Sequence, residues 1–132
     1  MKIGLKELLK KFENGKMKII MEDRYGMGYR IYSIINHAEV KNCINEADGD
    51  LWDVVIPGYK DKLKKKEYDT NDILGIFLLN NGNSKIFMRV DEEGYEKKRA
   101  CDDINKFISE YLYWNDDVSG EWFKWEEIRG RL

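Results

Sequence analysis

Residues 73–90 have the sequence ILGIFLLNNGNSKIFMRV, in which two apolar runs flank the turn sequence NNGN at 80–83. Short apolar runs rich in isoleucine and phenylalanine are typical of buried strands. An Asn-Gly pair between two such runs favours a tight turn, because glycine readily adopts the positive φ that the turn requires. We therefore predict a β-hairpin with strands at 73–79 and 84–90.

Hydrophobic periodicity predicts the remaining elements. Apolar residues at every third or fourth position indicate helices, and short apolar or β-branched runs indicate strands. The predicted helices cover 3–14, 37–47 and 95–112, and the predicted strands cover 17–22, 29–35 and 51–56. Residues 60–72 are expected to form a charged loop with a short edge strand, and the aromatic tail at 117–132 a last strand or a short helix. The sum is a single α+β domain over residues 1–132, with a mixed or mostly antiparallel sheet of about five strands and two or three helices on one side.

The helix at 37–47 is predicted from its amino-terminal sequence and its spacing. Asn36 followed by Glu39 three positions later matches a capping box. Val40, Cys43, Ile44 and Ala47 would then share one face of the helix.

The overall composition limits the classes of function. The chain has 132 residues, of which 42% are hydrophobic and 13% aromatic, enough for a real core. The 23 basic and 25 acidic residues give a net charge of -2, so the chain has no general field that would attract nucleic acid or a membrane surface.

Cys43 and Cys101 are expected to be free thiols. The single histidine, His37, rules out the usual His/Cys zinc site. A cytoplasmic location is expected, since no apolar run approaches the roughly 20 residues of a membrane span.

Three aspartates near the middle of the chain form the motif that points most directly to chemistry. Asp48, Asp50 and Asp53 occur in the sequence NEADGDLWDVVIPG at 45–58. Carboxylates at this spacing around a turn can converge on Mg²⁺, which binds a few protein oxygens together with water and substrate phosphate. The same string is also an ordinary turn, because aspartate caps its own backbone and glycine supplies positive φ. The motif leaves both interpretations open.

The string DGDLWDV at 48–54 resembles the signature of family I inorganic pyrophosphatases, an Asp-Gly-Asp-Pro-Leu-Asp-Val type sequence. The resemblance implies that Asp48, Asp50 and Asp53 bind magnesium; Leu51 and Trp52 depart from the family pattern. The wider pattern also includes Asn-His-Ala-Glu at 36–39, Pro-Gly-Tyr at 57–59 and the Asn-Gly-Asn turn. In this respect the chain is similar to small phage and prophage proteins that carry a pyrophosphatase label.

Two further groups are candidates for binding a ligand. Arg24, Tyr25 and Arg30 lie in a glycine-containing segment, and arginine binds phosphate through two parallel hydrogen bonds. The alternative for this segment is a hairpin turn without a ligand. His37 and Glu39 precede the aspartates, and a histidine near neutral pH can bind an anion or exchange a proton. The alternative is that both are surface or capping residues.

Three hypotheses for function follow. The first is a phage or prophage accessory protein, such as an anti-defence protein, that binds a phosphorylated small molecule (a nucleotide signal) or a host protein without catalysis. The second is a divergent magnesium-dependent phosphohydrolase acting on pyrophosphate, with Mg²⁺ the only cofactor expected and no catalytic side chain assigned. The third is an interaction module that forms a homo-oligomer through an exposed strand or the aromatic tail.

Overall fold

The computed structural model describes residues 1–21, 35–58, 66–89 and 97–130. The elements in chain order are β1 (Lys2–Ile3), α1 (Leu5–Asn14), β2 (Met17–Met21), β3 (Ile35–Asn45), β4 (Leu51–Pro57), β5 (Glu67–Tyr68), the 3-10 turn η2 (Thr70–Asp72), β6 (Ile73–Leu79), β7 (Lys85–Met88), α2 (Lys97–Trp114), β8 (Gly120–Lys124) and α3 (Trp125–Arg129).

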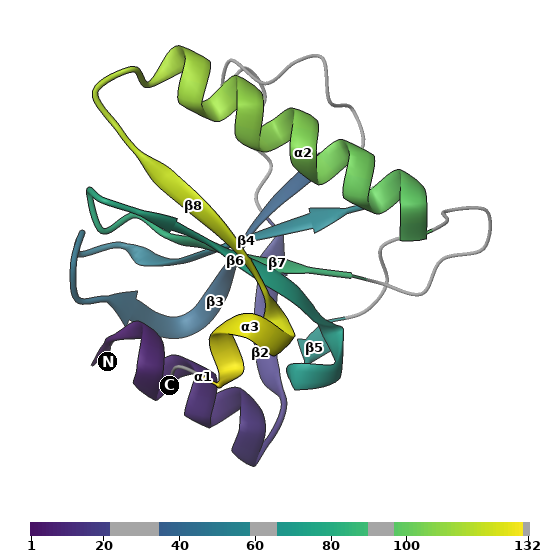
Figure 1. Ribbon diagram of the computed structural model, residues 1–132. Helices are drawn as coiled ribbons and strands as arrows, with labels where there is room; N and C mark the ends of the chain where they lie inside the picture. The colour runs from purple at the N-terminus through teal and green to yellow at the C-terminus, as the bar shows by residue number, and fades with distance from the viewer. Residues whose placement is uncertain (22–34, 59–65, 90–96, 131–132) are drawn as a thin grey trace.

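The strands form one mixed sheet with helices on both faces. The strand order is β5-β2-β3-β4-β7-β6-β8, and β1 pairs with β3 outside this order. The pairs β4/β7 and β1/β3 are parallel, and the other pairs are antiparallel. Figure 1 shows α2 on one side of the sheet, with α1 and α3 on the other. The hydrophobic core is therefore divided by the sheet into two layers.

Alternation along the strands assigns side chains to the two layers. On β4, Val54 and Ile56 pack with the apolar side chains of α1 and α3, including Leu8, Phe12 and Ile128. Val55 points to the opposite face, where it packs with side chains of the sheet and α2 (Phe77, Phe87, Ile104, Phe107 and Tyr111). Polar side chains of β4 that alternate with Val54 and Ile56 must consequently lie on the α2 face.

The predicted α+β class is confirmed, and two details are corrected. Among the residues that the structure describes, the sheet has eight strands, more than the five expected. The helices lie on both faces and not on one, because β4, β6 and β7 are apolar on both faces and each face must be covered. The predicted hairpin is confirmed as β6 and β7, and the long helix as α2. The tail forms both elements that were considered, β8 followed by α3.

The predicted helix at 37–47 is wrong, because these residues belong to β3. Asn36, Ala38 and Val40 are buried in alternation, as expected of a strand. The register then shifts between Glu39 and Ile44, and Asn42 adopts a φ of 61°. Before this bulge the buried residues have even numbers, and from residue 43 onward they have odd numbers. The spacing between buried residues on the two sides of the bulge therefore resembles the period of a helix.

Other expectations lie wholly or partly outside the described residues. The predicted strand at 29–35 is described only at Ile35, and the loop at 60–72 only from residue 66, where the expected edge strand is β5. Both cysteines are free thiols, Cys43 buried and Cys101 exposed. Within the described ranges, no helix is both long and apolar enough to cross a membrane.

Candidate functional site

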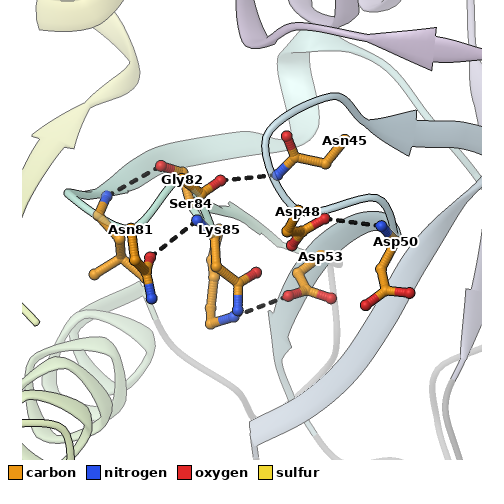
Figure 2. Close-up of polar contacts among 10 residues, drawn as sticks. Asn45, Asp48, Asp50, Asp53, Asn81, Gly82, Ser84 and Lys85 are labelled. Carbon is orange, nitrogen blue, oxygen red and sulfur yellow. Dashed lines mark hydrogen bonds and ion pairs between the residues drawn. The ribbon is translucent and has the colours of Figure 1, made fainter.

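The parallel pairing of β4 with β7 brings two turns to the same end of the sheet. Val54 lies opposite Ile86, so the residues just before them, Asp53 and Lys85, begin neighbouring strands. The β3–β4 turn at 46–50 and the β6–β7 turn at 80–84 precede these strands and therefore meet. Figure 2 shows the polar contacts that join them.

Asn45 holds the two turns together. Its side chain is buried, with the residue 2% exposed. Its amide Nδ2 donates a hydrogen bond of 2.9 Å to the carbonyl oxygen of Gly82, and its Oδ1 accepts one of 3.0 Å from the backbone N–H of Ala47. Gly82 has a φ of 83°, and a Cβ placed on it would lie 2.6 Å from the Cβ of Ala47. The turns are thus packed against each other at van der Waals contact, and their relative position is fixed.

A buried ion pair lies beneath the turns on the α2 face. Lys85 Nζ donates to Asp53 Oδ2 at 2.9 Å; the lysine side chain is 8% exposed and the aspartate side chain 30%. The same ammonium lies 5.4 Å from the centre of the Tyr111 ring, within cation–π range. Burial, and then the charge of Asp53, raise the pKa of Tyr111, and a side-chain hydrogen bond with Asn81 acts in the opposite direction. Tyr111 is therefore held as a neutral phenol beside the pair.

Two of the three predicted metal ligands converge. With its amide oriented to donate, Asn83 Nδ2 lies 2.7 Å from Asp53 Oδ2 and 3.2 Å from Asp48 Oδ2. Asp48 also caps its turn, since its Oδ1 accepts a hydrogen bond of 2.9 Å from the backbone N–H of Asp50. The Asp50 carboxylate is exposed and takes no part in the Asn83 contact.

The capping contact confirms that the Asp-Gly-Asp string is a real turn, with Gly49 at a φ of 79°. Within the part of the chain that the structure describes, no group of three or more His, Cys, Asp or Glu side chains is arranged to hold a metal ion. Magnesium binding by Asp48, Asp50 and Asp53 together therefore stays a prediction.

Glu39 and His37 lie on β3 and not on a helix. The Cα of Glu39 pairs with that of Asp53, so Glu39, Asp53 and Lys85 form a row across three neighbouring strands on the α2 face. His37 pairs with Val55, two residues further under α2, and its ring centre lies 5.9 Å from that of Phe107. The structure thus places both predicted ligand residues on the same face as the turns, with Glu39 the nearer of the two. Arg24, Tyr25 and Arg30 lie outside the described residues.

Sequence reasoning missed four residues of this site: Asn45, Asn83, Lys85 and Tyr111. Asn45 falls in the predicted helix at 37–47, Asn83 in the predicted turn at 80–83 and Tyr111 in the predicted helix at 95–112, and none of these assignments indicates a site. One signal for Lys85 was available, because a lysine that opens an apolar strand is buried only with a partner for its charge.

Comparisons of the chain with protein-family models, curated proteins and solved structures found no significant match. The geometry of the residues is accordingly the basis for the functional argument.

Proposed function

We propose that this protein binds a phosphorylated small molecule, without catalysis, through a magnesium ion held at the junction of the two turns. The observation that supports this proposal is the approach of Asp48 and Asp53 to the same amide of Asn83. Lys85 balances the charge of Asp53, and the shared amide of Asn83 is neutral, so one carboxylate charge stays unbalanced here and a hard cation would satisfy it.

The spacing of these groups suits magnesium. In an octahedral Mg²⁺ site with ligands at about 2.1 Å, neighbouring oxygens lie roughly 3 Å apart. The amide nitrogen of Asn83 lies 2.7 and 3.2 Å from the two carboxylate oxygens. A half-turn of the amide puts its carbonyl oxygen in place of the nitrogen, where it would lie beside both carboxylate oxygens as a third oxygen ligand. Asp48, Asp53 and Asn83 would hold the ion, which supplies positive charge for a phosphate.

The charge of the accessible groups explains why phosphate binding would need the metal. Asp48 and Asp50 are exposed and Asp53 is partly exposed, whereas Lys85 is buried beneath them. A phosphate approaching these carboxylates alone would be repelled. Magnesium bound through one or two carboxylates commonly completes its coordination with phosphate oxygens. The exposed amide of Asn81 can then donate a hydrogen bond to the same ligand.

Hydrolysis of pyrophosphate is the second candidate, supported by the resemblance of residues 48–54 to the pyrophosphatase signature. Binding alone is favoured because Lys85 and Tyr111, which carry protons beside the turns, are buried and already engaged. A general acid or base must reach the substrate within hydrogen-bond distance.

The test is a thermal-shift and calorimetric titration with Mg²⁺, pyrophosphate and nucleotides, together with an assay for released phosphate. We expect stabilisation only when Mg²⁺ and a phosphorylated ligand are both present, about 2.7 kcal/mol at a ligand concentration of 100 Kd. Asp48→Asn keeps the turn-capping oxygen but loses the charge, so this variant should lose the Mg²⁺-dependent shift. Asp50→Asn is the matched control, because Asp50 does not contact Asn83, and should keep the shift.

Release of phosphate by the wild type, abolished in Asp48→Asn, would replace the binding proposal with the hydrolase. Equal losses in the Asp48 and Asp50 variants would support the original three-aspartate prediction over the site with Asn83. The absence of any Mg²⁺-dependent shift in the wild type would refute all of these metal sites.

A further inference from the structure

A small hollow lies between α1 and α3, on the face of the sheet opposite to α2. It is lined by Lys6, Leu9, Lys10, Glu13 and Arg129 and has a volume of 230 Å³. Figure 1 shows that α1 and α3 are neighbours on this side of the sheet, whereas α2 covers the other side. The hollow therefore belongs to a separate part of the surface from the site proposed above.

The periodicity of α1 places three charged side chains beside the hollow. Lys6, Lys10 and Glu13 are spaced four and three residues apart, so they form one stripe along the exposed surface of the helix. Leu9 is 2% exposed and supplies an apolar floor that belongs to the core. Arg129 approaches from the last turn of α3. The lining carries three positive charges and one negative charge, a net charge of +2.

Little of this positive charge is neutralised within the described residues. The Nε of Arg129 lies 3.8 Å from Glu13 Oε1, a long contact between side chains that are 63% and 43% exposed. Such exposed pairs contribute little to stability and are easily exchanged for another partner. Lys6 and Lys10 form no ion pair in the described part of the chain. Because like charges four residues apart on a helix repel each other, an anion between them would remove an unfavourable interaction.

We propose that this hollow is a second binding site, which accepts a polyvalent phosphate anion without a metal ion. Guanidinium and ammonium groups together suit phosphate, the first by parallel hydrogen bonds and the second as a compact charge. The volume of the hollow is below the roughly 300–1,000 Å³ of pockets for drug-sized ligands. It therefore accepts a phosphate or diphosphate group, either free or at the end of a larger molecule whose remainder stays in solvent.

The test is a calorimetric or NMR titration with inorganic pyrophosphate in a chelating buffer at low ionic strength, which excludes the magnesium-dependent site. We expect Lys10→Gln and Arg129→Gln each to weaken binding by about two- to fivefold. Glu13→Gln should strengthen binding by a similar factor, because Glu13 is the one carboxylate among the described residues that line the hollow. All three side chains are exposed, so the variants are expected to fold normally.

Lys16→Gln is the matched control, since it changes the net charge equally at an exposed lysine just beyond α1 and outside the hollow. If Lys16→Gln weakens binding as much as Lys10→Gln does, the anion responds only to general charge and the site is refuted. The site is also refuted if pyrophosphate does not bind or if Glu13→Gln has no effect. Asp48→Asn should leave this titration unchanged, so the two sites can fail independently. Equal affinity for pyrophosphate and a nucleoside diphosphate would support recognition of the phosphate group alone.

Discussion

Removal of either partner of the Lys85–Asp53 pair should have unequal effects on stability. Asp53→Asn leaves an ammonium whose side chain is 8% exposed, facing a neutral amide oxygen. Lys85→Met leaves a carboxylate that is 30% exposed and can still accept a hydrogen bond from Asn83. The first change leaves an unpaired charge in the core, whereas the second leaves an unpaired charge that is in contact with water.

The exposure of the two side chains determines the expected difference in the free energy of unfolding. Removing one partner of a fully buried ion pair costs about 3–5 kcal/mol, and partial exposure of Asp53 lowers the expected cost of Asp53→Asn to about 2–3 kcal/mol. Methionine replaces most of the aliphatic stem of Lys85, so Lys85→Met should cost about 1 kcal/mol or less. At about 3–5 °C per kcal/mol for a chain of this length, these costs correspond to Tm losses of about 6–15 °C and at most about 5 °C.

The assay is reversible thermal or urea unfolding of the two single variants and the double variant. The double variant should lose about 1–2 kcal/mol less than the sum of the single losses, because the side chains are in direct contact. If Lys85→Met destabilises the protein as much as Asp53→Asn does, or if the two losses simply add, Lys85 is not a buried charge that depends on Asp53. The ion pair would then contribute nothing specific to the site.

Two further predictions concern the turns and the core. Gly82→Ala should cost at least about 2 kcal/mol in unfolding experiments, since it combines a φ of 83° with a Cβ 2.6 Å from that of Ala47. Gly49→Ala, at a φ of 79° with nothing within 4 Å, should cost only about 1 kcal/mol, and equal costs would contradict the packing of the two turns. Burial, and then the charge of Asp72, raise the pKa of Tyr68 to about 12. Because the unfolded phenol titrates near pH 10, the folded state keeps the Tyr68 proton to a higher pH than the unfolded state does. The contribution of this proton to the free energy of unfolding is therefore complete below pH 10 and is lost as the pH rises to about 12. Urea unfolding across this range should show a smaller pH dependence for Tyr68→Phe than for the wild type, and identical slopes would show that Tyr68 does not titrate as expected.

The sequence was sufficient to predict elements whose hydrophobic pattern is unbroken. The hairpin at 73–90 has two continuous apolar runs around a strong turn, and α2 has a regular stripe containing Ala100, Ile104 and Phe107. The sequence did not indicate β3 because of its bulge near Asn42. The buried residues have even numbers before the bulge and odd numbers after it, so the alternation typical of a strand is interrupted. A bulge depends on the partner strand, here β4, and local sequence contains little information about it.

The candidate site was only partly predictable for a related reason. The Asp-Gly-Asp turn is a local feature, and the sequence indicated it correctly. The contacts that give it neighbours join residues far apart in the chain: Asn45 with Gly82, and Asp53 with Lys85. These contacts depend on the parallel pairing of β4 with β7, which places β7 beside β4 although β5 and β6 separate them in sequence. Sheet order is a global property, so the partners of the turn could not be read from the residues around it.

The two proposed phosphate sites differ in the sign of their charge, and this difference makes them separable in one experiment. At the junction of the turns the accessible groups are mainly carboxylates, so phosphate affinity there should increase with Mg²⁺ concentration. In the hollow between α1 and α3 the lining has a net charge of +2, so Mg²⁺ should lower affinity by forming a complex with the free ligand. A pyrophosphate titration with rising Mg²⁺ should therefore strengthen one binding event and weaken the other. Asp48→Asn should remove only the first event and Lys10→Gln should weaken only the second, because Asp48 does not line the hollow and Lys10 does not contact the Asn83 amide.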